Sequence, residues 1–462
     1  MRVIHWWHLP TPIADEACGH RAAPRGVAVR LPVLLLFSIA LSAVSGAAAN
    51  PEPAALERSV KPEETVAPPE HGDETTAGER PPLRPTRSPR LRIHPRQLRL
   101  DLNPGWDVTA ACDLSELLHY TPVGGFQPGV ACLWRRRHPG GSAEIVLDSA
   151  VNVAGPSTDW LLGPRLRVPA WHLAEVGVQI YDLTDTSDQW RADRRQSSLS
   201  FATQNRPEAD FFRRQGWSAF ATAQVAQRGL LGVEYRLDEY RSVTTRDDVW
   251  ILPRELEIAW RNPAVQAGRM GSLILRAEWS SARIPIDSVG VIRRQPEMSL
   301  VTAWPRGEHV SFRTLNTLEI ARPALGGDSR FSFTRLISDH SLRFDGGPLG
   351  GLKLRARFAA GWDAPPQKEE GLGGWGSVRG YSFKRYRGDL SLMGTIEYRY
   401  GRLAAFCDVG SVREPAGWSG LLTGVGMRLF LWHDLNLGAA WRTSGSGGNP
   451  FPSVRLQLTQ GW

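Results

Sequence analysis

Beyond residue 49 the sequence lacks any long apolar run, so we expect no transmembrane helix in the mature chain. The longest run, residues 31–44, has about fourteen mostly apolar residues, whereas a helix needs about twenty to span a bilayer. Arginines precede this run and the small residues Gly46-Ala47-Ala48-Ala49 follow it, which is the arrangement of a secretory signal. We therefore predict a signal peptide at residues 1–49 and export of the mature chain.

Cysteine is scarce as well. Only Cys112, Cys132 and Cys407 follow the expected cleavage site. None belongs to a CxxC pair or lies near a histidine at metal-ligand spacing, so we expect no metal site and no cofactor. An oxidising compartment would allow a disulfide between Cys112 and Cys132, and the sequence leaves this open.

The chain has no block of basic residues beside aromatic side chains. Its 55 lysines and arginines outnumber its 47 aspartates and glutamates, giving a formal charge of +8, but the excess is spread along the sequence. Proteins that bind nucleic acid concentrate their basic residues on one face. We therefore expect no nucleic-acid partner and interpret the arginines as solvated or lumen-lining.

Residues 50–96 contain no aromatic residue and few large aliphatic ones, and they are rich in Pro, Glu, Arg and Thr. Such a segment cannot bury enough apolar surface to offset the entropy of ordering. We predict that it is a disordered periplasmic stretch. It also lacks the apolar periodicity of a folded periplasmic module.

From about residue 98, short runs alternate apolar and polar residues, and Gly, Pro, Asp and Asn separate them. Alternation with a period of two is typical of strands. The candidate strands are residues 129–136, 143–151, 171–181, 197–203, 217–225, 230–237, 250–260, 271–279, 298–304, 310–320, 330–336, 352–359, 390–400, 403–409, 423–431, 435–442 and 454–462. Because bacterial barrels have an even number of strands, we predict about sixteen.

The last candidate strand ends on an aromatic residue. Leu456, Leu458 and Trp462 share its apolar face, and together they form the expected C-terminal strand signal. The final strand of a transmembrane barrel pairs with the first, and an aromatic residue suits the membrane interface. We predict an all-β fold in which residues 97–462 form a transmembrane antiparallel β-barrel in the cell outer membrane, in contact with its lipid. A soluble all-β protein is the alternative, since it would also alternate.

A loop of about thirty residues, too long for a simple hairpin, precedes the strand that begins near Leu390. It contains the motif Gly371-Leu-Gly-Gly-Trp-Gly-Ser-Val-Arg-Gly-Tyr381, and two strand motifs follow it, Gly394-Thr-Ile-Glu-Tyr-Arg-Tyr400 and Phe406-Cys-Asp-Val-Gly-Ser-Val412. This ordered trio resembles outer-membrane barrels of the BamA and TamA type, the bacterial surface antigen superfamily. The resemblance is sharp over residues 371–462 and weak upstream.

The resemblance implies that the loop folds into the lumen of the barrel, where its arginine meets acidic residues on later strands. The loop motif is matched by Val378, Arg379, Gly380 and Tyr381, the strand acid by Glu397, and the Phe-x-Asp-x-Gly strand by Phe406, Asp408 and Gly410. Alternation independently places Glu397 and Asp408 on the polar face of their strands, where a planar guanidinium can be held by two bonds.

The resemblance also implies insertion or translocation of proteins at the outer membrane, without covalent chemistry and with unfolded outer-membrane or exported proteins as partners. Members normally carry periplasmic POTRA modules, and none is recognisable here. A passive or structural barrel, acting as a pore or a docking surface, is therefore the alternative. We do not expect an enzyme, because Gly327-Asp-Ser-Arg330 lacks the Gly-x-Ser-x-Gly spacing and Asp339 and His340 are interpreted as loop residues rather than members of a catalytic triad.

Overall fold

The computed structural model describes residues 90–94, 97–101, 108–113, 119–137, 144–154, 157–168, 173–205, 207–246, 260–285, 295–301, 309–432, 435–444 and 452–458. All of them belong to one unit of the chain, Leu83–Trp462. The predicted signal peptide at residues 1–49 lies outside the described residues, as do residues 50–89 of the predicted disordered stretch.

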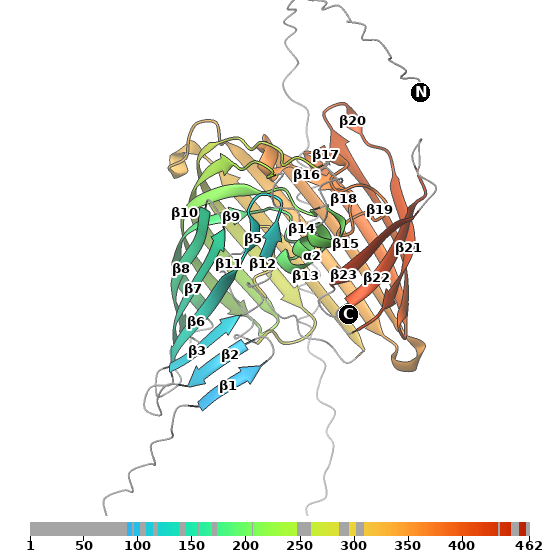
Figure 1. The fold of residues 1–462 in the computed structure, drawn as a ribbon. Helices are drawn as coiled ribbons and strands as arrows, with labels where there is room; N and C mark the ends of the chain where they lie inside the picture. Colours follow the sequence, from blue (N-terminus) through green and yellow to red (C-terminus); the bar gives the residue numbers. More distant parts are fainter. Residues whose placement is uncertain are drawn as a thin grey trace, which may run out of the picture. The chain divides into compact units, whose positions relative to one another are not determined.

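Nineteen strands form one antiparallel sheet, in which nearly every strand pairs with its neighbours along the chain (Figure 1). They are β1 (Arg90–His94), β2 (Gln97–Asp101), β3 (Val108–Asp113), β6 (Gly129–Arg137), β7 (Glu144–Ala154), β8 (Ser157–Val168), β9 (Leu173–Asp185), β10 (Phe212–Val225), β11 (Gly229–Ser242), β12 (Gly268–Ser280), β13 (Val310–Ala321), β14 (Phe333–Asp345), β15 (Gly351–Trp362), β18 (Leu390–Tyr400), β19 (Leu403–Glu414), β20 (Gly417–Trp418), β21 (Leu422–Phe430), β22 (Leu435–Arg442) and β23 (Ser453–Leu458). Strands β1 and β2 extend the sheet beyond β3, and β20 is a two-residue addition to β19. The other sixteen strands confirm the predicted number.

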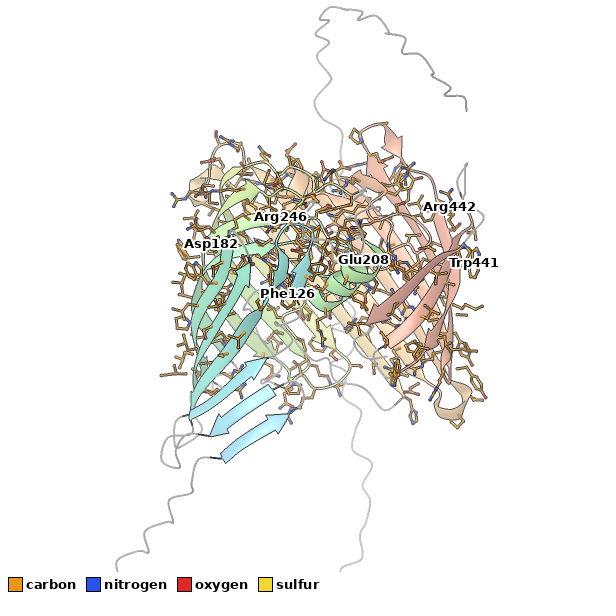
Figure 2. The ribbon with its side chains drawn as sticks, in the orientation of Figure 1. Phe126, Asp182, Glu208, Arg246, Trp441 and Arg442 are labelled. Carbon is orange, nitrogen blue, oxygen red and sulfur yellow. The ribbon has the colours of Figure 1, made fainter. Side chains whose placement is uncertain are left out.

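The sheet curls around an inner space, the lumen, as Figure 1 shows. Side chains alternate across the wall: in β11, Glu234 and Arg236 are each 1% exposed, whereas Leu231 and Val233 are 51% and 42% exposed. In Figure 2, Glu208 lies within the lumen, while Trp441 lies on the wall. An apolar exterior around a polar interior is the arrangement of a transmembrane β-barrel, and it is the reverse of a soluble domain.

The described helices include none that is long and apolar enough to cross a membrane.

The two margins of the sheet are β1 and β23. Among the described residues, β23 pairs with β22, and no residue-by-residue pairing joins it to β1, β2 or β3. Two smaller two-stranded sheets accompany the wall, β4–β5 (His119–Thr121 and Gly125–Gln127) and β16–β17 (Glu370–Leu372 and Tyr386–Gly388). Strand β23 therefore has one edge with no strand beside it in the described part of the chain.

One predicted strand, residues 197–203, is wrong, because this segment is the helix α2 (Arg194–Gln204). The Asp193 side chain caps the helix by accepting a bond of 2.7 Å from the backbone N–H of Gln196, and Asn205 ends it in a left-handed conformation with φ of 53°. The serines and apolar residues alternate as they would in a strand, but the caps at Asp193 and Asn205 favour a helix.

Other expectations also need correction. Residues 298–301 form no strand. Residues 295–298 make a turn, in which Met298 N–H donates to the Gln295 carbonyl at 2.9 Å, and residues 302–304 of the predicted strand lie outside the described residues. Of the predicted strand 250–260, only Trp260 is described, and it is not in a strand. Two of the sixteen wall strands, β3 and β8, were not predicted. In β8, Gly163 and Pro164 interrupt the alternating pattern, and proline cannot donate to a ladder.

Strand β1 falls within residues 50–96, which we expected to be disordered, so ordered structure begins before residue 97. Its pairing with β2 compensates for the weak apolar content of the segment. The cysteines are better defined by the structure than by the sequence. Cys132 is disulfide-bonded, and the β3–β6 register sets it opposite Cys112, whereas Cys407 is free and exposed on β19.

Candidate functional site

The loop between β15 and β18, residues 363–389, folds back along the lumen side of the last strands. Its two arms pair with each other as β16 and β17. Its middle part, residues 373–381, packs against β19, β21 and β22. The loop therefore contacts the strands next to the β23 margin of the sheet.

Arg379 is the central residue of this loop. Its Nε and Nη2 donate to the two carboxylate oxygens of Asp408 at 2.6 and 2.7 Å, and its backbone N–H also donates to Asp408 at 3.0 Å. Its Nη1 donates to Glu397 at 2.9 Å. Arg379 is 2% exposed and Asp408 is 0% exposed. The guanidinium is thus held by a bidentate bond and a second carboxylate, out of contact with bulk water.

Aromatic and cationic neighbours complete the surroundings of Arg379. Its Cζ lies 3.4 Å from the ring centroid of Phe406, and Trp375 packs against the same ring edge-to-face at 6.3 Å. Arg428 donates to the other oxygen of Glu397 at 3.3 Å. Burial lowers the pKa of Arg379, but the charges of Asp408 and Glu397 outweigh burial and raise the pKa above its ordinary value. Arg379 therefore stays charged.

Val378 and Tyr381 anchor the loop on either side of the arginine. Val378 is fully buried in an apolar cluster whose other members are Leu372, Tyr381, Met393, Val412 and Leu422. The Tyr381 hydroxyl donates to the Ser444 carbonyl at 2.8 Å, just beyond β22. Gly380 has φ of 92°, and a Cβ there would lie 2.7 Å from the Arg442 backbone nitrogen, so this position requires glycine.

Three glycines on the lumen face of the wall allow the loop to approach closely. A Cβ at Gly410 would lie 2.6 Å from the Leu372 side chain, one at Gly424 would lie 2.1 Å from the Arg379 carbonyl oxygen, and one at Gly438 would lie 2.6 Å from the Trp375 ring. Sequence reasoning singled out Gly410 but missed the other two. The signal was present, because a glycine at an inward position of a strand marks a close approach.

A second set of contacts, also missed, comes from residues 186–193 between β9 and α2. Arg191 donates to the Ser377 hydroxyl at 3.1 Å, and the Arg357 guanidinium lies 3.8 Å from the Trp190 ring centroid. Lys384 in the loop pairs with Asp188 at 2.8 Å. This segment has no apolar periodicity, so its contacts with the loop cannot be read from its sequence.

Glu370, at the start of β16, ties the loop to β14, the neighbour of β15 in the wall. It pairs with Arg335 on β14, which also pairs with Glu297 from the turn at residues 295–298. Burial raises the pKa of Glu370, but the positive charges of Arg335, Arg357 and Arg191 outweigh burial and lower the pKa to about 2. Glu370 is therefore ionised at neutral pH.

Helix α2 lies between the β4–β5 hairpin and the margin strand β23 (Figure 1). The backbone N–H of Leu458 donates to Gln196 Oε1 at 2.5 Å, and Gln204 donates to the Val454 carbonyl at 3.4 Å. On the other side of the helix, Tyr120 N–H of β4 donates to Ser198 at 2.9 Å. Side chains of α2 thus bond to backbone groups of β23 that point away from β22.

The expected C-terminal strand signal is divided between described and undescribed residues. Leu456 and Leu458 lie on the outward face of β23, and Arg455, which pairs with Glu208, lies on the lumen face. Trp462 lies outside the described residues. The structure brings Val378, Arg379, Gly380, Tyr381, Glu397 and Asp408 together in one place, whereas Leu456 and Leu458 belong to the margin of the sheet.

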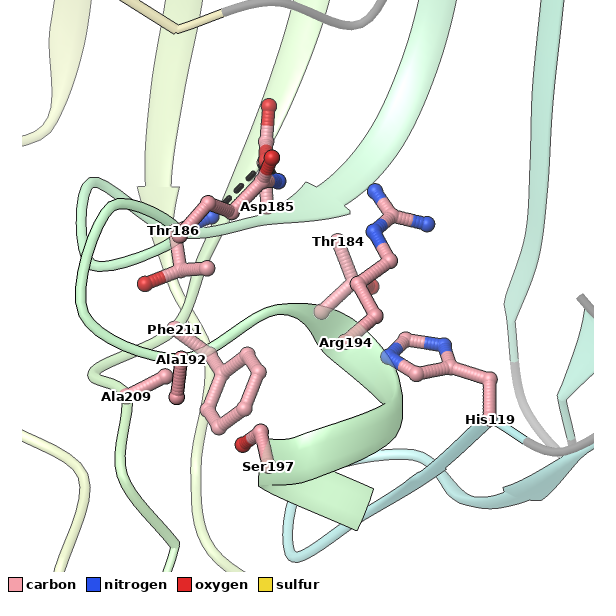
Figure 3. A pocket seen from close by; sticks show the side chains of 10 residues that line it. His119, Thr184, Asp185, Thr186, Ala192, Arg194, Ser197, Ala209 and Phe211 are labelled. Atoms are coloured by element: carbon pink, nitrogen blue, oxygen red, sulfur yellow. Dashed lines mark hydrogen bonds between the residues drawn. The ribbon is translucent and has the colours of Figure 1, made fainter. Parts of the chain in front are cut away.

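The lumen contains little empty space near α2. Figure 3 shows His119, Thr184 and Arg194 around a cavity of about 10 Å³, which is room for a single water molecule. A larger cavity of about 310 Å³ lies between Trp260 and Lys384. Among the described residues, no group of His, Cys, Asp or Glu is arranged to hold a metal ion.

No protein-family model and no curated protein sequence matches this chain. Solved structures with a similar fold include BamA from Haemophilus ducreyi lacking POTRA domains 1–3, at 13% identity over 72% of this chain and 67% of that chain, with a TM-score of 0.43. CdiB from Acinetobacter baumannii has 10% identity over 72% and 57% of the two chains, with a TM-score of 0.36. A mutant porin from Rh. blastica has 9% identity over 76% and 89%, with a TM-score of 0.31. At such scores, the description of this chain as a membrane barrel wall rests on its own strand register and side-chain placement.

Proposed function

We propose that this protein is an outer-membrane β-barrel of the protein insertion or translocation type, acting through its strand seam and lumen loop without covalent chemistry. The observation that carries the proposal is the edge of β23. In the described residues this edge faces no strand, and side chains of α2 cover it instead. A row of backbone donors and acceptors at a sheet edge can pair with an incoming extended chain.

The alternation of hydrogen bonds along β23 defines which of its backbone groups point away from β22 and can pair with an incoming strand. Residues of a strand in an antiparallel sheet direct both backbone groups to the same side, and the side switches at each residue. Because Val454 and Leu458 bond to α2 rather than to β22, Leu456 between them also points its N–H and C=O away from β22. These three residues form the surface on which a client strand would pair.

The lumen loop supports this surface from inside. Arg379 joins the loop to β18 and β19, and Tyr381 joins it to the end of β22. These contacts hold the last strands in shape while the neighbouring edge exchanges partners. In this proposal the loop has a structural role, so no group in it undergoes a chemical step.

We place the barrel in the outer membrane with its long connections outside. The connections after β9, β11, β15 and β19 lie at one end of the wall. The short turns at residues 226–228, 346–350 and 401–402 lie at the other end, together with one long connection, residues 281–309. Bacterial barrels carry long extracellular loops and short periplasmic turns. Outer-membrane lipid would contact the wall, and unfolded outer-membrane or exported proteins would be the clients.

The test is a reconstituted assembly assay. The full chain is placed in lipid vesicles, a urea-unfolded outer-membrane barrel protein is added as the probe client, and its folding is followed by the heat-sensitive gel shift of folded barrels. We expect faster client folding with the protein than with empty vesicles. Leu456→Pro should abolish this gain, because proline removes the N–H at the edge of β23 and none of the bonds to β22.

Leu456→Val is the matched control, since it keeps the N–H and should keep the gain. Both variants must show the intact heat-sensitive barrel band. Equal stimulation by Leu456→Pro and the natural protein would contradict the use of this edge. No stimulation by the natural protein would favour a passive or structural barrel.

A further inference from the structure

Four polar residues interrupt the apolar outer face of the wall. Thr314 and Asn316 on β13 lie beside His340 and Ser338 on β14, as the register pairs Thr314 with His340 and Asn316 with Ser338. We call these four residues the outer quartet. Asp339 points the other way, into the lumen, where it pairs with Arg355 at 2.6 Å. Asp339 and His340 are thus strand residues on opposite faces, and not loop residues as the sequence suggested.

The outer quartet lies midway along its strands, inside the apolar band. Phe312 and Phe344 lie on the same face toward one end of the strands and are 37% and 39% exposed. Leu318 and Leu336 lie on this face toward the other end. His340 is an exposed residue. The quartet is therefore presented to the middle of the membrane rather than to its polar surface.

The outer quartet forms a directed chain of hydrogen bonds. Ser338 donates its one hydroxyl proton to Asn316 Oδ1 at 2.7 Å, so it must accept from His340 Nε2, 2.8 Å away. Asn316 in turn donates to the Thr314 hydroxyl at 3.3 Å. The chain ends with an acceptor, His340 Nδ1, and with a donor, the hydroxyl proton of Thr314.

Lipid acyl chains cannot satisfy the hydrogen-bonding groups of the outer quartet. Acyl chains offer no hydrogen-bonding group, and polar side chains in the apolar part of a bilayer are costly without a partner. Lipid headgroups lie at the interface, beyond the apolar residues at both ends of these strands. A matching surface must therefore come from another membrane-embedded protein.

We propose that the outer quartet is the interface between two copies of this chain in the membrane. In a two-fold symmetric contact the same patch meets itself, so the donor end of each quartet can reach the acceptor end of the other. The exposed alanines Ala277 on β12 and Ala356 on β15 flank the quartet, and small residues let two membrane-embedded surfaces approach closely. The polar ends are complementary to each other, which favours a second copy over an unrelated partner.

This inference is independent of the proposed function, which uses the edge of β23. Strands β13 and β14 are the ninth and tenth of the sixteen wall strands, and β23 is the last. A dimer formed through β13 and β14 would leave the edge of β23 accessible in both copies.

The first test is disulfide cross-linking of the full chain in its native membrane. Ser338→Cys in a Cys407→Ser background should give an oxidised product of twice the monomer mass. Val178→Cys on β9, an equally outward position that is 42% exposed, is the matched control and should stay monomeric. A product with the mass of a different protein, or equal products from both variants, would overturn the proposal.

The second test removes the polar chain. Asn316→Leu combined with His340→Leu should weaken self-association in lipid vesicles about tenfold, as expected for the loss of two membrane hydrogen bonds of ordinary strength. Self-association is measured as the dimer fraction against the protein-to-lipid ratio. Folding is verified by the heat-sensitive band, and His340→Leu alone, which removes the acceptor end of the chain, serves if the double variant fails to fold. An unchanged dimer fraction, or a natural protein that is monomeric at every ratio, would refute the interface.

Discussion

At the scale of single residues, the contacts of Arg379 join residues far apart in the sequence. Its guanidinium binds Asp408 on β19 and Glu397 on β18, and its carbonyl oxygen rests against Gly424 on β21. A buried charge is tolerated only when its partners are present. The stability of the loop should therefore depend on this one side chain and on the space left for its backbone.

Arg379→Ala should lower the stability of the barrel. Removing one partner of a buried ion pair typically costs about 3 to 5 kcal/mol, because the remaining carboxylates are left without a counter-charge. Arg379→Lys should restore only part of the loss, since an ammonium cannot make the bidentate bond. The measurement is urea-induced unfolding in detergent micelles. A double-mutant cycle with Asp408→Asn should show coupling, and strict additivity would contradict the interaction.

Gly424→Ala should loosen the loop without removing any charge. The new methyl group would lie 2.1 Å from the Arg379 carbonyl oxygen, so the loop or the strand must move, at a cost of about 1 to 3 kcal/mol. Gly394→Ala is the control, because its methyl group would face outward with only the Val409 side chain near it, at 3.2 Å. Limited proteolysis of the loop measures the effect, and equal protection in both variants would argue against close packing at Gly424.

At the scale of elements, α2 takes the place of a strand beside β23. A helix cannot continue a ladder, so in the described part of the chain α2 reaches the edge through side chains, those of Gln196 and Gln204. Two side-chain bonds hold the edge less firmly than a full strand would. The margin of the sheet should therefore exchange its partner more readily than any strand within the wall.

Removing the two glutamine side chains should expose the edge of β23. In the variant Gln196→Ala/Gln204→Ala, we expect roughly tenfold faster hydrogen exchange at the Leu458 amide, equal to the loss of a bond worth about 1.4 kcal/mol. Thr203→Ala is the control, because Thr203 bonds only within the helix, to the Leu199 carbonyl. Mass spectrometry of the C-terminal peptide gives the rates. Unchanged exchange would mean that α2 does not protect this edge.

At the scale of the whole molecule, ion pairs facing the lumen tie together the loop, the connection after β9 and the strands β14 and β23. Glu370 pairs with Arg335 on β14, Lys384 pairs with Asp188 after β9, and Arg455 on β23 pairs with Glu208. Each pair joins segments that are distant in the sequence. The barrel should therefore respond as a unit when these carboxylates are protonated.

The unfolding free energy should fall on acidification, and Glu370 should account for part of the fall. Its pKa is lowered to about 2 in the folded chain, against an ordinary value near 4.5. Its ionised form therefore stabilises the fold above about pH 4.5, by about 3 kcal/mol, and this contribution is lost as the pH falls toward 2. Urea unfolding at several pH values should show Glu370→Gln less stable than the natural protein at pH 7 and equal to it near pH 2. A difference independent of pH would contradict this assignment.

The sequence determined most of the segments that form the wall and which face of each of them points outward. Apolar and polar residues alternate with a period of two along a strand. This alternation is a local property, so it can be recognised without knowing the neighbours of the strand. The same rule placed Glu397 and Asp408 on the polar faces of their strands, and the motif around Arg379 indicated the loop that contacts them. The rule failed where local chemistry competed with it, at the capped helix α2 and at Gly163-Pro164 in β8.

Only the tertiary structure decided which segments meet across the lumen and at the margins of the sheet. The contact of Gln204 with Val454 spans 250 residues, and the contact of Arg191 with Ser377 spans 186. The outer quartet likewise exists only because the register sets Asn316 opposite Ser338, since a shift of one residue would send one of them into the lumen. Such contacts depend on strand register and on the curl of the sheet, which are properties of the whole wall, so no single stretch of sequence contains them.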